Sequence, residues 1–204
     1  MKILAFDTCL DKTYITLAEN KNIIKNIIIN SDSENYHSAY LISSIVKILK
    51  DSELEPSNID CIATDIGPGS FTGIRACTTV ARVLAQQLNI KAVGVSSLEI
   101  LSKIQDKNNM VVLDARKNKG YVYDNKILGA IELEKIDELV KGKTVITDNS
   151  LKERLTLNAD KVISYQEQEY PLSEILNQIA LTKTETDWRK LKPLYIQPPP
   201  VFSK

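Results

Sequence analysis

Residues 67–75 read Gly-Pro-Gly-Ser-Phe-Thr-Gly-Ile-Arg. The stretch follows an apolar run at 59–64 that predicts a strand, and it opens a helical pattern at about 71–88. A turn in this setting can hold an anion on the backbone amides at the helix start. A tight connection without a ligand has the same features. The stretch therefore indicates a strand–turn–helix unit of an α/β fold, and both interpretations of the turn stay open.

The turn matches none of the common phosphate or nucleophile motifs. Its spacing is not Gly-x-Gly-x-x-Gly, and it has neither the Gly-Lys-Ser/Thr of a P-loop nor a Gly-x-Ser-x-Gly elbow. Glycine allows close backbone approach, proline stiffens a turn, and a hydroxyl side chain caps a helix. The residues with these properties are Gly67, Pro68, Gly69, Ser70 and Gly73, with Thr72 as a second capping candidate.

The elements around the turn follow a recognisable order. Runs rich in β-branched residues predict strands, and apolar positions at helical spacing predict helices. The order β-β-β-α-β-α-β-α is that of the ribonuclease H-like unit found in each half of actin-like proteins, with a partly parallel sheet. The predicted strands are 2–8, 12–19, 22–30, 59–64 and 92–95, and the predicted helices are about 36–50, 71–88 and 97–103.

A second block follows residue 105 with weaker periodicity. Strands are predicted at 110–115, 120–124 and 144–147, and a short helix at 172–181. The block repeats the strand–aspartate–loop–strand beginning of the first. We therefore expect an actin-like lobe at 1–105 and a smaller, degenerate α/β lobe at 106–204. The proline-rich end, 192–200, predicts an extended tail because proline fixes φ and removes a donor.

Composition excludes several classes of protein. Lys and Arg number 26, as do Asp and Glu, so the formal net charge is zero and gives no basic field for nucleic acid. No stretch approaches the ~18 consecutive apolar residues of a membrane span. The N-terminal apolar run is short and ends at Asp7, which argues against a signal peptide. We expect a cytoplasmic protein without membrane contact.

The sequence offers little for a metal site. His37 is the single histidine, and histidine-based sites usually use two or three imidazoles. Cys9, Cys61 and Cys77 are widely spaced and form no Cys-x-x-Cys pair, so they indicate neither a zinc site nor a disulfide framework. We expect no metal site, and for His37 we favour an interface or capping role.

Two helices carry more apolar surface than one small lobe can cover. The only charged residues of the 71–88 helix are Arg75 and Arg82, and its small and apolar residues occupy more than one face. The 36–50 helix has a similarly wide apolar arc. Either both helices are enclosed within the fold or another chain covers them, and we favour the second interpretation.

Several segments resemble the bacterial TsaB family, also called YeaZ, whose members are inactive paralogues of TsaD/Kae1 in the actin-like superfamily. The turn at 67–75 is the most specific match, and the others follow in order to about residue 197. They are Ile3-Leu4-Ala5-Phe6-Asp7-Thr8, His37-Ser38 followed by Leu41, Gly94-Val95-Ser96-Ser97-Leu98, Leu113-Asp114-Ala115-Arg116, Gly120-Tyr121-Val122-Tyr123 and Pro193-Leu194-Tyr195-Ile196. Lys117-Asn118-Lys119 stands where the family usually has an acidic residue before the strand that contains Gly120-Tyr121, and the region after about 125 is short and diverged.

The resemblance implies a scaffold subunit that pairs with a TsaD-like catalytic paralogue, with a TsaE-like ATPase joining the pair. The assembly transfers threonylcarbamoyl to adenosine 37 of ANN-decoding tRNAs. It implies ATP and a divalent metal in the partners, tRNA contact only through the complex, and a possible homodimer of the isolated chain. The expected contact residues lie on the two helices: His37, Tyr40, Leu41, Ser44, Ile45, Phe71, Thr72, Arg75, Ala76, Thr79 and Val80.

We expect no catalytic residue and no cofactor bound by this chain alone. Asp7 and Thr8 match the aspartate hairpin of actin-like ATPases, but the second block lacks the glycine-rich loops that complete such a site. Asp7 is interpreted as a structural turn residue rather than a magnesium ligand. The alternative is an autonomous hydrolase of the superfamily, either an ATPase or a metallopeptidase.

Overall fold

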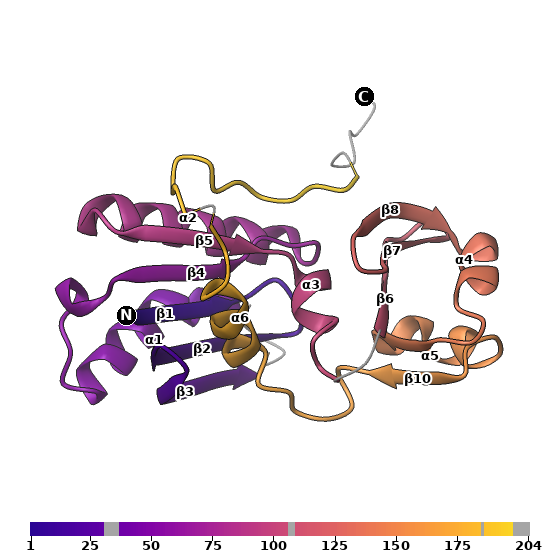
Figure 1. Ribbon diagram of the computed structural model, residues 1–204, viewed down its shortest axis with the longest axis horizontal. Helices are drawn as coiled ribbons and strands as arrows, with labels where there is room; N and C mark the ends of the chain where they lie inside the picture. The colour runs from indigo at the N-terminus through magenta and orange to yellow at the C-terminus, as the bar shows by residue number, and fades with distance from the viewer. Residues whose placement is uncertain (31–36, 106–108, 185, 198–204) are drawn as a thin grey trace. The chain divides into compact units, whose positions relative to one another are not determined.

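The computed structural model describes residues 1–30, 37–105, 109–184 and 186–197. The chain forms two compact units, each built on a five-stranded mixed sheet (Figure 1). The first unit comprises Met1–Ser97 and Pro171–Leu194, and the second comprises Leu98–Tyr170 and the C-terminal residues from Tyr195. The predicted helix start at 36, the side chain of His37 and the three-proline tail lie outside the described residues.

The first sheet has the strand order β3-β2-β1-β4-β5. The three N-terminal strands form an antiparallel meander, and β4 and β5 extend it in parallel with β1. Parallel pairing needs crossover connections, and the helices α1 and α2 supply them. The strands are β1 Lys2–Asp7, β2 Lys12–Glu19, β3 Asn22–Asn30, β4 Cys61–Asp65 and β5 Lys91–Val95.

Helices cover both faces of the first sheet. Leu4 and Phe6 of β1 pack with α1 and α2, while Thr16 of β2 faces the other way and lies 2.6 Å from the Ser173 hydroxyl of α6. Figure 1 shows α6 crossing this second face. The elements are α1 Leu41–Asp51, α2 Phe71–Leu88, α3 Ser97–Leu101 and α6 Leu172–Ala180, with 3-10 turns η1 His37–Tyr40 and η2 Pro56–Asn58.

The second sheet repeats the topology of the first. Its order is β10-β9-β6-β7-β8, with an antiparallel meander β6-β7-β8 and parallel strands β9 and β10. Residues of α4 and α5 pack on one face of it, around Val112, Ile136 and Leu155. The elements are β6 Asn109–Asp114, β7 Lys119–Tyr123, β8 Ile127–Glu132, α4 Leu133–Leu139, β9 Thr144–Thr147, α5 Asn149–Thr156 and β10 Lys161–Ser164.

The expected actin-like α/β fold is confirmed, and the second lobe is more complete than the sequence indicated. It contains β8, α4, α5 and β10, none of which the periodicity predicted. The division also differs from the expected one at residue 105. The helix predicted at 172–181 forms, but it packs on the first sheet through Leu172, Leu176 and Ile179, because that face would otherwise be uncovered.

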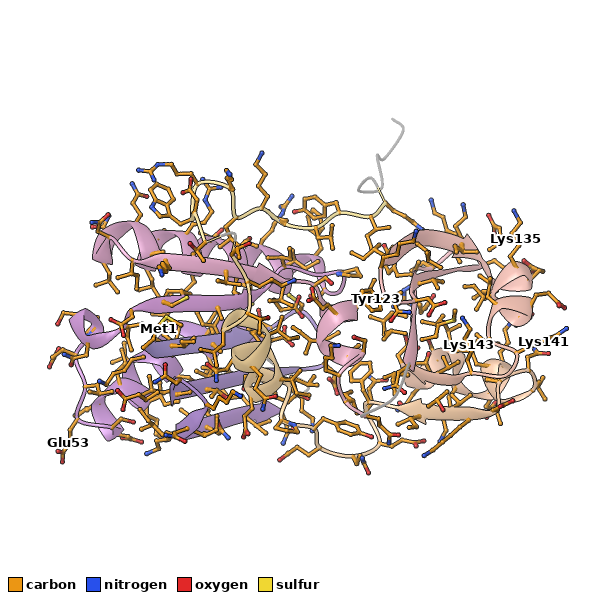
Figure 2. All side chains as sticks on the ribbon, viewed as in Figure 1. Met1, Glu53, Tyr123, Lys135, Lys141 and Lys143 are labelled. Carbon is orange, nitrogen blue, oxygen red and sulfur yellow. The ribbon has the colours of Figure 1, made fainter. Side chains whose placement is uncertain are left out.

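The outer surface of the second unit is strongly charged. The ammonium of Lys143 lies 2.6 Å from the Asp124 carboxylate, and Lys141 lies 2.7 Å from Glu138. Figure 2 shows the Lys135 and Lys141 side chains projecting into solvent beside α4. In the described part of the chain, no helix is long and apolar enough to cross a membrane.

Candidate functional site

An apolar groove runs between α1 and α2 of the first unit, with a volume of ≈ 390 Å³. Its rim is formed by side chains that a stable core would bury: Ile42 is 63% exposed, Val46 60% and Val83 51%. A contiguous apolar surface of this kind marks an interaction site more often than ordinary surface does. The groove is lined by Leu4, Ile42, Ile45, Val46, Leu49, Pro56, Ile59, Ile62, Thr79, Val80, Val83, Leu84 and Leu88.

The sequence of α1 explains how the groove arises. Leu41, Ile45 and Ile48 follow helical spacing and are buried against the sheet. Ile42 and Val46 lie one turn apart on the adjacent face of α1, which does not contact the sheet. The apolar arc of α1 is therefore wider than the contact that the first unit offers.

The second wall comes from α2, which packs closely because its buried positions are small. Cys77, Ala81 and Ala85 face the sheet and are inaccessible to solvent. Their small side chains allow the helix axis to lie near the strands. Val80 and Val83 line the groove on the side that faces α1. The small residues therefore serve packing inside the unit, while the flank of α2 remains available.

The predicted contact residues divide into three groups. Ile45, Thr79 and Val80 line the groove, with Ile45 only 5% exposed, and Leu41 is buried in the core at 1% exposure. Leu41 packs against the sheet, and its contact with a partner stays a prediction. The remaining described positions are exposed or half-buried on α1, on α2 and on the 3-10 turn η1 before α1: Tyr40, Ser44, Phe71, Thr72, Arg75 and Ala76.

The expected contact residues did not include Ile42, Val46 and Val83, which form the exposed rim of the groove. The signal was present, since all three belong to the wide apolar arcs that indicated an interface. Periodicity does not say which edge of an arc faces the sheet.

Near the start of α2, the Arg75 guanidinium lies 3.8 Å from the centroid of the Phe71 ring, a cation–π contact that holds both side chains at the surface.

The glycines of the 67–75 turn allow the turn to pack directly on the loop after β1. A Cβ on Gly73 would lie 1.8 Å from the carbonyl oxygen of Thr8, and a Cβ on Gly69 would lie 2.2 Å from that of Cys9. Gly67 has a φ of +99°, a conformation that favours glycine. The glycines are therefore required for backbone contact within the unit.

Several amides of the turn already have partners. The amide of Gly67 donates to the Asp65 carboxylate at 2.7 Å, and that of Ser70 donates to the Cys9 carbonyl at 2.7 Å. The Gly73 amide donates to the Ser70 hydroxyl at 3.3 Å, so Ser70 is the helix cap. These three amides are not available to a phosphate, which favours the interpretation of the turn as a tight connection.

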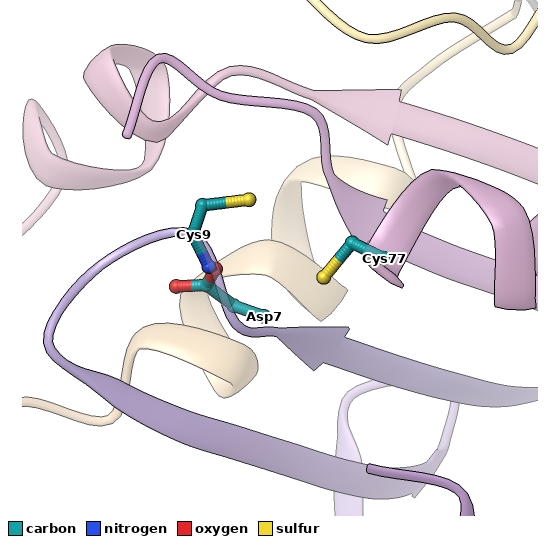
Figure 3. Close-up of side chains that lie close together, drawn as sticks. All are labelled: Asp7, Cys9 and Cys77. Atoms are coloured by element: carbon teal, nitrogen blue, oxygen red, sulfur yellow. The ribbon is translucent and has the colours of Figure 1, made fainter. Parts of the chain in front are cut away.

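Beneath the turn lies a buried group of polar side chains. Asp7 ends β1, Cys9 follows it, Cys77 comes from α2, and Asp65 ends β4. Figure 3 shows Asp7, Cys9 and Cys77 close together, and one ligand atom of each lies within 4.8 Å of the others. The Cys9 amide donates to Asp7 Oδ1 at 2.6 Å, and the Ser97 hydroxyl donates to Asp65 Oδ1 at 2.9 Å.

Burial changes the ionisation of this group. It raises the pKa of Asp65 to about 7, since a charged carboxylate loses its hydration there. Burial and then the nearby charge of Asp65 hold the pKa of Asp7 well above its usual range. Burial and the neighbouring thiol of Cys77 raise the pKa of Cys9. The group therefore favours protons or a cation over uncompensated negative charge.

The two repeated sheets, each a β-β-β-α-β-α-β unit, define a two-lobed actin-like α/β protein. YeaZ from Pseudomonas aeruginosa has the same fold, with a TM-score of 0.74 and 20% identity over 95% of this chain and 99% of that one. The family model TsaD, tRNA N6-adenosine threonylcarbamoyltransferase, matches residues 22–177, which is more than half of the chain.

Curated relatives agree with this class. A TsaB from Buchnera aphidicola subsp. Baizongia pistaciae is 36% identical over 102 residues, which is 50% of this chain and 45% of that protein. TsaB from Bacillus subtilis is 32% identical over 135 residues, 63% of this chain and 58% of that protein. The matches thus span about half the length of these relatives. The chain belongs to the TsaD family, within its TsaB (YeaZ) branch.

Proposed function

We propose that this chain is a non-catalytic scaffold subunit in the synthesis of threonylcarbamoyladenosine in tRNA. In this proposal, a TsaD-like catalytic paralogue docks on the α1–α2 groove and transfers threonylcarbamoyl to adenosine 37 of ANN-decoding tRNAs. The observation that carries the proposal is the exposed apolar rim at Ile42, Val46 and Val83. The relatives named as tRNA threonylcarbamoyladenosine biosynthesis proteins supply the pathway.

The chemistry of the groove favours a partner with an apolar helical face. Burying a Val or Ile side chain contributes roughly 1.5–3 kcal/mol, so the rim residues alone supply a substantial binding term. A paralogue with the same fold has its own pair of helices at this position and can offer a matching surface. A second copy of this chain offers it too, which accounts for a homodimer in the absence of the partner.

The surroundings of the turn support a non-catalytic role. An actin-like ATPase needs free amides and an accessible aspartate for phosphate and metal. Here the amides of Gly67, Ser70 and Gly73 have internal partners, and Asp7 is completely buried. ATP and a catalytic divalent metal therefore belong, in this proposal, to the TsaD-like and TsaE-like partners. With a net charge of zero, the chain contacts tRNA only within the complex.

Depletion of the chain in its native host tests the proposal. We expect threonylcarbamoyladenosine, measured by mass spectrometry of digested tRNA, to fall strongly and to recover when the wild-type chain is supplied. The Leu157→Glu variant should also restore it, since Leu157 is 82% exposed and belongs to the second unit, whereas the groove lies on the first. An unchanged level of the modified nucleoside after depletion would contradict the proposal.

The alternative of an autonomous hydrolase has a separate test. The purified chain is incubated with ATP or with peptides and divalent metals, and turnover is measured. We expect none above background. Robust turnover by the isolated chain that tracks its concentration and disappears on heat denaturation contradicts the scaffold role and favours the hydrolase.

A further inference from the structure

We propose that Asp7, Cys9 and Cys77 bind a structural Zn²⁺ ion beneath the 67–75 turn. This site shares no residue with the docking groove and does not depend on the proposed function. It joins the end of β1, the loop after it and helix α2, segments separated by almost seventy positions in the sequence. All three side chains are buried, and Figure 3 shows them close together.

The spacing of the ligand atoms suits zinc. The carboxylate oxygen and the two Sγ atoms lie within 4.8 Å of one another. Some point then lies within about 2.8 Å of all three atoms, and Zn–S and Zn–O bonds are about 2.3 and 2.0–2.2 Å long. A contraction of about half an ångström therefore completes three bonds, and it needs no rearrangement of the backbone.

The buried carboxyl group of Asp7 also interacts with a second carboxyl group. Asp7 and Asp65 share a side-chain hydrogen bond, which needs a proton between them. A cation bound by Asp7 would take the place of that proton. Asp65 itself lies outside the group of three ligand atoms.

Neighbouring groups already orient the ligands. The Thr8 amide donates to Cys77 Sγ at 3.2 Å, and the Cys9 amide donates to Asp7 Oδ1 at 2.6 Å. Such second contacts fix ligand direction in metal sites and stabilise a thiolate. On binding, the two thiols and the Asp7 carboxyl group each release a proton to solvent, so the Zn²⁺ ion and its three ligands together carry one negative charge.

The ligand types select zinc over other common ions. Two sulfur ligands disfavour magnesium and calcium, which prefer oxygen, and a carboxylate ligand disfavours Cu⁺, which prefers sulfur alone. Structural zinc sites are closed and bind the ion through four ligands, of which this cluster supplies three. Because the site is buried, the ion enters when the chain folds rather than by diffusion into the finished unit.

Refolding of the full chain tests the site. The chain is unfolded in denaturant under reducing conditions and refolded with Zn²⁺ or with a chelator, and bound metal is measured after gel filtration. We expect one Zn²⁺ per chain and a higher Tm for the zinc-refolded protein. Refolding with Co²⁺ should give the sulfur-to-cobalt charge-transfer absorption of thiolate ligation.

Cys61 provides the matched control, because it is equally buried but lies on β4 outside the cluster. The Cys9→Ser and Cys77→Ser variants should each retain at least about tenfold less zinc than the wild type. The Cys61→Ser variant should keep the wild-type zinc content. The Co²⁺ charge-transfer band should weaken in the first two variants only. A chain that folds normally without zinc and refolds without retaining it overturns the proposal, as does equal zinc retention by all three variants.

Discussion

Gly73 and Thr8 meet backbone to backbone, and this contact explains why the 67–75 turn tolerates no side chain there. The Thr8 hydroxyl donates to the Gly73 carbonyl at 2.9 Å, and a Cβ on Gly73 would lie 1.8 Å from the Thr8 carbonyl oxygen. Because the opposing atom belongs to the backbone, it cannot move aside as a flexible side chain would. The start of α2 is thereby fixed against the end of β1.

Gly73→Ala should therefore destabilise the protein strongly. Overpacking against backbone costs about 3 kcal/mol in a well-packed core, which urea unfolding can measure. Gly142→Ala is the control, since Gly142 has a φ of +70° and open space around its Cβ position. That variant should lose only about 1 kcal/mol, from the left-handed conformation alone. Equal losses in the two variants would show that the close contact has no energetic role.

At this scale, the sequence indicated the turn but not the cluster beneath it. The glycines and the capping Ser70 follow from local rules. Cys9 and Cys77 do not, because cysteine spacing indicates a metal site only when the ligands are close in sequence. Their meeting depends on the parallel pairing of β1 with β4 and the crossover through α2. Only the folded chain brings the two thiols together.

Among the elements, α6 best shows the limit of reading along the chain. Its apolar spacing predicted a helix, and the helix forms. The sequence could not assign it to a sheet, because 171–194 follows the second unit and returns to the first. The Asn177 side chain donates to the Asn20 carbonyl at 3.0 Å, which ties α6 to the loop between β2 and β3.

Leu176→Ala tests the assignment of α6. Leu176 is completely buried, and its truncation should cost about 2–5 kcal/mol. Hydrogen exchange followed by mass spectrometry should show faster exchange in β1 and β2. The matched variant is Leu155→Ala, which removes an equally buried leucine of α5 and should act on β6 and β9 instead. Faster exchange in the second sheet of Leu176→Ala would contradict the assignment.

For the whole molecule, the sequence predicted the first lobe well and the second only in part. Strands β1, β2 and β4 of the first sheet are buried on both faces, so their apolar runs are clear. In the second unit, β8 and β10 are mostly half-buried or exposed, and α4 has only seven residues. Such short elements gain their stability from packing rather than from a strong local pattern. The repeated topology is therefore a property of the folded chain.

The molecule as a whole combines a neutral net charge with an apolar groove on one unit and a charged surface on the other. Scattered exposed apolar residues are normal, but a lined groove between two helices is not. We therefore assign the proposed docking role to the groove, where the chain would hold its partner.

The most direct test measures the affinity of this chain for the TsaD-like paralogue of the same organism by titration calorimetry. Val46→Glu and Val83→Glu should each weaken binding by about 30-fold or more, which is about 2 kcal/mol, because a carboxylate is buried in an apolar contact. Leu157→Glu should bind like the wild type, and all three variants should keep the wild-type Tm. Wild-type affinity in the Val46→Glu and Val83→Glu variants would contradict docking at the groove.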